Sequence, residues 1–197
     1  MANQLKINHQ AFIRYKFFNS LFFGIAIGSY VTQYEPLKIE DFPIMGIIFS
    51  LLAIPIAMMY NKIMTMNYFY KFSLLVEVIM LIWIIAFLID PYSYQIALLI
   101  YIARQITFLF GDFLGRAETL FIKKTEILSS IDVAKQLGAI TGMIISVIFY
   151  KILEYKFLIT ENEPKVFYMH FLVCVIEIVI IVMLMKSFQK TNNYSCS

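Results

Sequence analysis

The sequence has few charged residues and few of the residues that build metal or nucleophilic sites. Charged residues make up 15% of the 197 residues, whereas soluble domains carry about a quarter. The two cysteines (Cys174 and Cys196) and the two histidines (His9 and His170) lie apart from one another, which argues against a disulfide framework or a metal centre. No glycine-rich phosphate loop or nucleophile elbow is present. We therefore expect no enzyme, no metal and no cofactor.

The placement of the charges also argues against nucleic-acid binding and against a cleavable signal peptide. The net charge of +3 is spread over many separate segments, which argues against a nucleic-acid surface. The first ten residues are polar, and no short apolar region with a small-residue cleavage site follows them. We therefore expect no cleavable signal peptide.

Long apolar runs dominate the chain. Hydrophobic residues make up 61% of it and the mean hydropathy is +0.78. A membrane-spanning helix needs roughly 20 mostly apolar residues, and six stretches qualify when flanking residues are included: 17–32, 43–60, 72–89, 94–113, 137–153 and 167–184. Continuous runs of this length favour helices over the alternating strands of a membrane barrel. The expected fold is a single all-α transmembrane domain over 1–197 with six helices.

The lysines and arginines between these runs predict the orientation, because basic residues gather on the cytoplasmic side. Four alternate polar segments, which include both termini, hold eleven bases: Lys6, Arg14, Lys16, Lys62, Lys71, Arg116, Lys123, Lys124, Lys135, Lys186 and Lys190. The opposite segments hold four: Lys38, Lys151, Lys156 and Lys165. Both termini should therefore be cytoplasmic. The expected location is a bacterial inner or plasma membrane, with the lipid bilayer as the first partner.

Three ionisable residues lie near the middle of predicted spans: Glu77, Arg104 and Glu177. A bare guanidinium there costs several kcal/mol, so we expect Arg104 to pair with one of the two glutamates. Desolvation should raise the pKa of a glutamate left unpaired, which could then carry a proton. A buried ion pair that only fixes helix register is the alternative. Polar Asn19 and Gln105 could line a water-filled cavity together with Arg104, between the first, fourth and fifth spans.

Six of the seven glycines form pairs four residues apart, a spacing that lets helices approach closely. The pairs are Gly24 with Gly28, Gly111 with Gly115, and Gly138 with Gly142. Static packing is one interpretation, and smooth faces that let helices slide are the other.

The polar segment between the fourth and fifth spans mixes apolar and charged residues. It predicts an amphipathic helix over about 116–132, lying at the cytoplasmic interface, with a partner-docking segment as the alternative. Asp112 lies just before this segment, and we expect it to pair with Arg116 one helical turn later.

Several of these features together resemble one six-helix half of a major facilitator superfamily transporter. Residues 34–37 (YEPL) and 43–50 (PIMGIIFS) resemble the first loop and second helix of that family, and residues 135–143 (KQLGAITGM) resemble the start of its fifth helix. Arg104 stands where the family has an arginine that is linked to proton-coupled transport. Residues 61–67 (NKIMTMN) lack the Asp and Gly of the family's loop signature, Phe108 stands near an expected glycine and Met143 replaces an expected proline.

The resemblance implies a function for this chain. The family has twelve helices in two halves with the substrate between them, so this chain would act as a homodimer or with a second six-helix half. We expect secondary transport of a small solute, in which Glu77 or Glu177 could carry a proton, while the coupling ion itself stays open. The candidate pathway residues are Arg104, Glu77, Glu177, Asp112, Gln105 and Asn19. The alternatives are a structural or interaction protein of the membrane, or a truncated transporter remnant.

Overall fold

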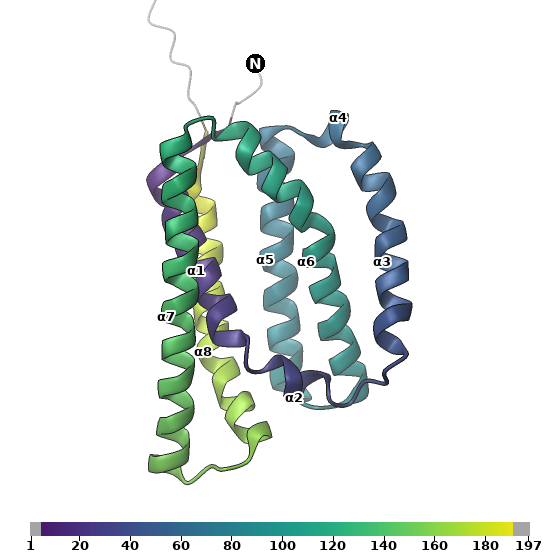
Figure 1. The fold of residues 1–197 in the computed structure, drawn as a ribbon, viewed down its shortest axis with the longest axis vertical. Helices are drawn as coiled ribbons and strands as arrows, with labels where there is room; N and C mark the ends of the chain where they lie inside the picture. The colour runs from purple at the N-terminus through teal and green to yellow at the C-terminus, as the bar shows by residue number, and fades with distance from the viewer. Residues whose placement is uncertain (1–4, 191–197) are drawn as a thin grey trace, which may run out of the picture.

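A computed structural model describes residues 5–190 of the chain as a bundle of helices (Figure 1). Its elements are β1 (Leu5–Ile7), α1 (His9–Ala26), α2 (Tyr30–Tyr34), α3 (Asp41–Met58), α4 (Tyr60–Ile63), α5 (Met66–Ile89), α6 (Tyr94–Phe121), α7 (Thr125–Phe157), α8 (Asn162–Ser187) and β2 (Phe188–Lys190). Five helices are long and apolar enough to cross a membrane: α3, α5, α6, α7 and α8. The helical membrane class is confirmed. Cys196 lies outside the described residues.

The first expected span differs most from the structure. The expected range was 17–32, but α1 begins at His9, where the Asn8 side chain accepts a hydrogen bond from the Ala11 amide at 3.2 Å and caps the helix. It ends at Ala26, whose carbonyl accepts bonds from both the amide and the hydroxyl of Ser29. Because α1 therefore includes the polar turns around Arg14 and Asn19, it is not among the five apolar candidates.

The predicted amphipathic helix over 116–132 is wrong as a separate element. Helix α6 continues to Phe121 and α7 already begins at Thr125. Two apolar side chains near this junction, Ile122 and Ile131, are fully buried in the bundle, although Leu120 is 48% exposed. Burying them against the other helices removes them from the membrane interface, which is where a surface-lying helix would have placed them.

A short antiparallel ribbon, absent from the sequence-based expectation, joins the two ends of the described chain. Strand β1 pairs with β2 so that Leu5 lies opposite Lys190 and Ile7 opposite Phe188. The Asn8 amide also donates to the Ser187 carbonyl at 2.9 Å. Both termini therefore lie at one end of the bundle, together with α4 and the α6–α7 junction (Figure 1). We call this the terminal end.

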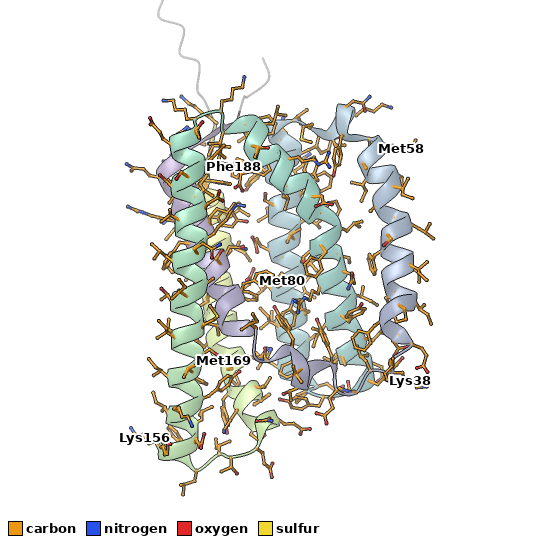
Figure 2. The ribbon with its side chains drawn as sticks, in the orientation of Figure 1. Lys38, Met58, Met80, Lys156, Met169 and Phe188 are labelled. Atoms are coloured by element: carbon orange, nitrogen blue, oxygen red, sulfur yellow. The ribbon has the colours of Figure 1, made fainter. Side chains whose placement is uncertain are left out.

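The helices pack in a definite order. Helix α1 lies between α7 and α8, α8 packs against α5, α5 against α6, and α6 against α3. Met80 and Met169 lie inside the bundle, while Met58 at the end of α3 is 77% exposed (Figure 2). Helix α3 has no buried residue at all. Apart from the side that contacts α6, where Phe42, Met45 and Ile56 are partly buried, its apolar surface is thus available to lipid or to another protein.

Candidate functional site

Two glutamates meet in the interior of the bundle. Glu77 on α5 is 2% exposed and Glu177 on α8 is 1% exposed. Each falls on the buried stripe of its own helix, where buried residues recur every three or four positions (Ser73, Glu77, Met80 on α5 and Val173, Glu177, Ile180 on α8). Because α5 packs against α8, both carboxyl groups lie in the interior between these two helices.

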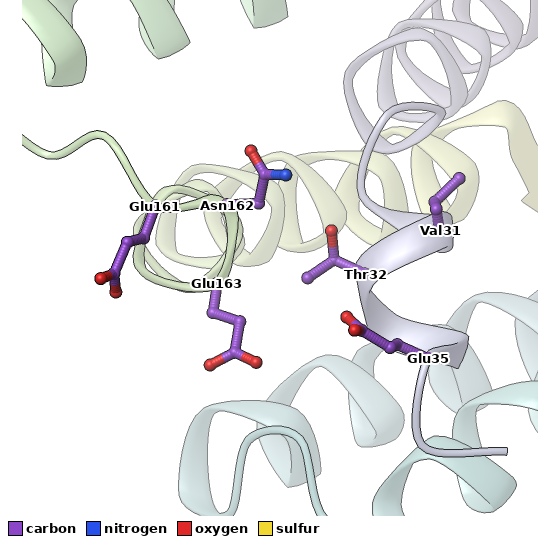
Figure 3. Close-up of a pocket in the computed structure, with 6 residues that line it drawn as sticks. All are labelled: Val31, Thr32, Glu35, Glu161, Asn162 and Glu163. Carbon is purple, nitrogen blue, oxygen red and sulfur yellow. The ribbon is translucent and has the colours of Figure 1, made fainter.

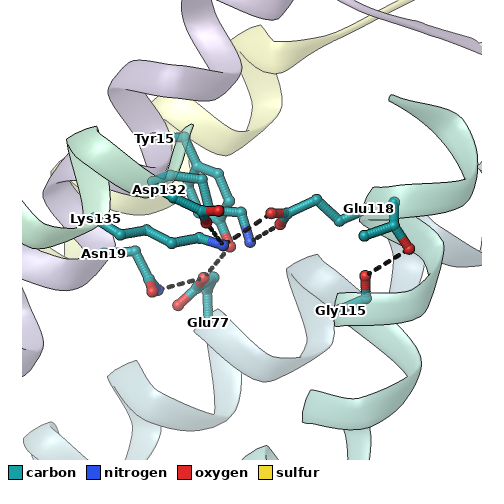
Figure 4. Close-up of polar contacts among 9 residues, drawn as sticks. Tyr15, Asn19, Glu77, Gly115, Glu118, Asp132 and Lys135 are labelled. Carbon is teal, nitrogen blue, oxygen red and sulfur yellow. Dashed lines mark hydrogen bonds and ion pairs between the residues drawn. The ribbon is translucent and has the colours of Figure 1, made fainter. Parts of the chain in front are cut away.

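Helix α1 supplies the hydrogen-bond donors to this carboxyl pair. The Tyr15 hydroxyl donates to Glu77 Oε1 at 2.6 Å and the Asn19 side-chain amide donates to the same oxygen at 3.0 Å (Figure 4). Glu177 Oε1 is buried and has no hydrogen-bond partner among the described residues. One carboxyl group is thus well held, and the other keeps an unused acceptor.

A second buried polar cluster lies close by, toward the terminal end. Glu118 on α6 is 5% exposed and accepts two ion pairs, from Lys16 Nζ on α1 at 2.5 Å and from Lys135 Nζ on α7 at 2.8 Å. Lys135 also lies 3.3 Å from the exposed Asp132. Figure 4 shows Glu118, Lys135 and Asp132 converging on the region beside Tyr15 and Glu77. We call Lys16, Glu118 and Lys135 the ionic triad.

The expected ion pair between Arg104 and a glutamate is wrong. Arg104 forms no ion pair within residues 5–190, and its guanidinium carbon instead lies 3.7 Å from the centre of the Tyr30 ring. The reason is the face of each helix: α6 packs against α5, but Arg104 faces Tyr30 on α2, whereas Glu77 faces Tyr15 and Asn19 on α1. The tyrosine ring offers a cation–π contact in place of a counter-ion.

The remaining pathway candidates are not brought together. Asp112 is exposed and does not pair with Arg116, whose guanidinium instead lies 5.5 Å from the Tyr60 ring. Gln105 is half-buried on α6. Asn19 and Gln105 lie on α1 and α6, two helices that make no extensive contact with each other, because α1 packs against α7 and α8 while α6 packs with α3 and α5.

The glycines mark one close helix contact. A methyl group added at Gly24, Gly138 or Gly142 would overlap a backbone carbonyl oxygen of the opposite helix in the α1–α7 pair. Gly28 has only the Tyr150 ring near it, at 3.8 Å. Around Gly111 and Gly115 there is nothing within 4 Å, so the close approach expected there is missing. Two of the three spacings thus serve a single interface.

His170 has a packing role in the described chain. Its Nδ1 lies 2.7 Å from the Val166 carbonyl and therefore donates to it, which leaves Nε2 to accept from the Gln33 side-chain amide. The ring also packs between Trp83 and Phe87. This contact fastens the α2 segment to α8.

The opposite end of the bundle carries an acidic pocket of about 720 Å³. Glu35, Glu161 and Glu163 line it together with Val31, Thr32 and Asn162 (Figure 3). Within the part of the chain that the structure describes, no group of three His, Cys, Asp or Glu residues could hold a metal ion. The pocket is open to solvent, so its charges are solvated.

Four residues of the two clusters were absent from the sequence-based candidates: Tyr15, Lys16, Glu118 and Lys135. Glu118 follows Phe113 and Ala117 on the buried stripe of α6, and this spacing was the available signal. Tyr15 and Lys16 lie before the long apolar run, so a search confined to that run could not reach them.

Comparison with protein-family models, with curated proteins and with solved structures gave no match for this chain. The interpretation of its function therefore rests on the geometry of the two buried clusters.

Proposed function

We propose that this membrane protein is a proton-coupled secondary transporter of a small solute, and that Glu77 and Glu177 hold the coupling proton. The observation that carries the proposal is the burial of two carboxyl groups on packed helices, one of which keeps an oxygen without a partner. Two neighbouring buried carboxylates cannot both be ionised without a large penalty, so this arrangement favours a proton held by the pair. Deep ionisable residues in membrane proteins commonly belong to proton or substrate pathways.

Two features support a transporter over a static bundle. Arg104 lies within a membrane-crossing helix and has no acidic partner in residues 5–190, so its charge is available to an anionic group of a solute or a partner chain. Within residues 5–190, no element covers the side of α3 that faces away from α6 or the side of α6 at Gly111 and Gly115. We infer that a second copy of the chain, or another six-helix half, covers this side, with α1 as the sixth crossing of each half.

The test is uptake into proteoliposomes that contain the full chain. A mixture of small solutes is offered with and without an inward proton gradient, and the solutes retained are identified by mass spectrometry. We expect the gradient to drive accumulation of at least one solute, and Glu177→Gln to abolish it. Glu35→Gln, the same change at an exposed position, should leave accumulation unchanged. Gradient-driven accumulation that survives in the Glu77→Gln, Glu177→Gln double variant would refute the proposed role of the pair.

A further inference from the structure

Lys16 lies between the carboxyl pair and the ionic triad. It directly follows Tyr15, the residue that donates to Glu77, and its Nζ lies 2.5 Å from Glu118 Oε2. It is also within electrostatic reach of Glu77. The Lys16 side chain is only 16% exposed, so water screens these interactions weakly. One ammonium group therefore serves two carboxyl sites.

Glu118, the ion-pair partner of Lys16, connects α6 to the α1–α7 side of the bundle. Helix α6 packs against α3 and α5 but makes no extensive contact with α1 or α7. The Glu118 side chain nevertheless reaches Lys16 on α1 and Lys135 on α7. The ionic triad therefore holds α6 against the α1–α7 pair at the terminal end.

The two lysines of the triad differ in their other partners. Lys135 has a second carboxylate, Asp132, on its own helix at 3.3 Å. Lys16 has no second ion pair in the described chain, and its Nζ lies 5.5 Å from the centre of the Tyr15 ring, whose hydroxyl donates to Glu77. A second negative charge on the carboxyl pair would therefore compete for Lys16 and leave Lys135 in place.

We propose that Lys16 is a positioning residue through which the proton on the Glu77–Glu177 pair controls the ionic triad. The inference rests on the proposed function, because the pair must exchange a proton. While the pair holds its proton, Lys16 stays on Glu118 and the terminal end is closed. When the proton leaves to solvent, the pair gains a second negative charge, which draws Lys16 toward Glu77. Glu118 is then held by Lys135 alone, and α6 separates from α1 and α7.

The test measures the distance between α6 and α7 in the full chain, reconstituted in lipid nanodiscs. Spin labels are attached at Thr119→Cys and Ser129→Cys, two exposed positions, with Cys174→Ser and Cys196→Ser in the background. Distance distributions are recorded across a pH series, and infrared spectroscopy follows the protonated-carboxyl band of the pair in the same samples. We expect a longer-distance population to rise several-fold as that band disappears.

Three variants separate Lys16 from a general loosening of the bundle. Lys16→Gln should abolish the dependence of the distance on pH while the carboxyl band still titrates. Lys135→Gln should lengthen the α6–α7 distance at every pH but leave its dependence on pH. Lys16→Arg should also keep that pH dependence, because the positive charge is retained. Distances that stay constant while the band titrates, or a pH response that survives in Lys16→Gln, would overturn the role of Lys16 alone. A carboxyl band that never changes would overturn the proposed function itself.

Discussion

At the residue scale, Tyr15 makes the shortest hydrogen bond to the buried carboxyl pair. Its hydroxyl is 2.6 Å from Glu77 Oε1 and the tyrosine is 4% exposed. Tyr15→Phe removes this donor and should lower the free energy of unfolding by about 1–3 kcal/mol, because a charge-assisted bond is lost in a buried setting. Denaturation of the detergent-solubilised protein checks this. Tyr155→Phe, at a tyrosine that is 74% exposed, is the control, and equal effects of the two changes would contradict the assignment.

Substitution of Arg104 should affect solute uptake much more than it affects the stability of the bundle. Its main contact is the face of Tyr30, and a cation–π contact contributes about 0.5–2 kcal/mol. Arg104→Ala should therefore cost the bundle little stability, yet abolish solute uptake, because an unpaired guanidinium is the group that would hold an anionic partner. Arg116→Ala, at an exposed position over Tyr60, is the control. Normal uptake by the Arg104→Ala variant would contradict the role.

Single residues also show which parts of the site could be predicted from the sequence. Glu77 and Glu177 could be singled out because a charge inside an apolar run is conspicuous. Asn19 was also a candidate, but Tyr15 was not, and neither could be assigned to Glu77, because these hydrogen bonds form only when α1 is placed beside α8 in the folded bundle. Arg104 was given the wrong partner for the same reason: equal depth in the membrane does not say which way a side chain faces around its helix.

At the element scale, the α1–α7 contact depends on glycine at particular positions. A methyl group at Gly142 would overlap the Leu21 carbonyl oxygen, and overpacking of this kind typically costs about 1–3 kcal/mol. Gly142→Ala should therefore lower the thermal midpoint of unfolding.

Gly115→Ala is the matched change on α6, where no atom lies within 4 Å. It should be neutral or slightly stabilising, because alanine is favoured over glycine within a helix by about 0.5–1 kcal/mol. A Gly142→Ala variant as stable as Gly115→Ala would show that α1 and α7 are not in close contact.

Most element positions follow from local sequence. Apolar runs predict α3, α5 and α8 within a few residues, and Ser93 caps α6 through the Ile96 amide one residue before the expected start. Where a helix boundary differs from the prediction, the cause is a local feature that apolar runs do not reveal. The Asn8 cap begins α1 earlier than predicted, and the Ser29 bonds to the Ala26 carbonyl end it earlier. Burial of Ile131 makes the polar connector part of α7. The β1–β2 ribbon joins segments from opposite ends of the chain, so no local pattern predicts it.

At the scale of the whole molecule, one side of the bundle is uncovered. Helix α3 has no buried residue, and the surface of α6 around Gly111 and Gly115 is open. We predict that the particle extracted into nanodiscs contains two copies of the chain, or one copy and a second six-helix chain, since a closed two-fold assembly is the simplest way to cover this side. Native mass spectrometry gives the composition. A uniform monomer that still transports solute would contradict this arrangement.

The central claim is that the Glu77–Glu177 pair holds an exchangeable proton, and infrared spectroscopy of the reconstituted protein tests it most directly. At neutral pH the wild-type chain should show a protonated-carboxyl band that weakens as the pH rises. The Glu77→Gln, Glu177→Gln double variant should lack this band, and Glu35→Gln should keep it. A wild-type spectrum identical to that of the double variant would mean that both carboxyl groups are ionised, and it would contradict the account.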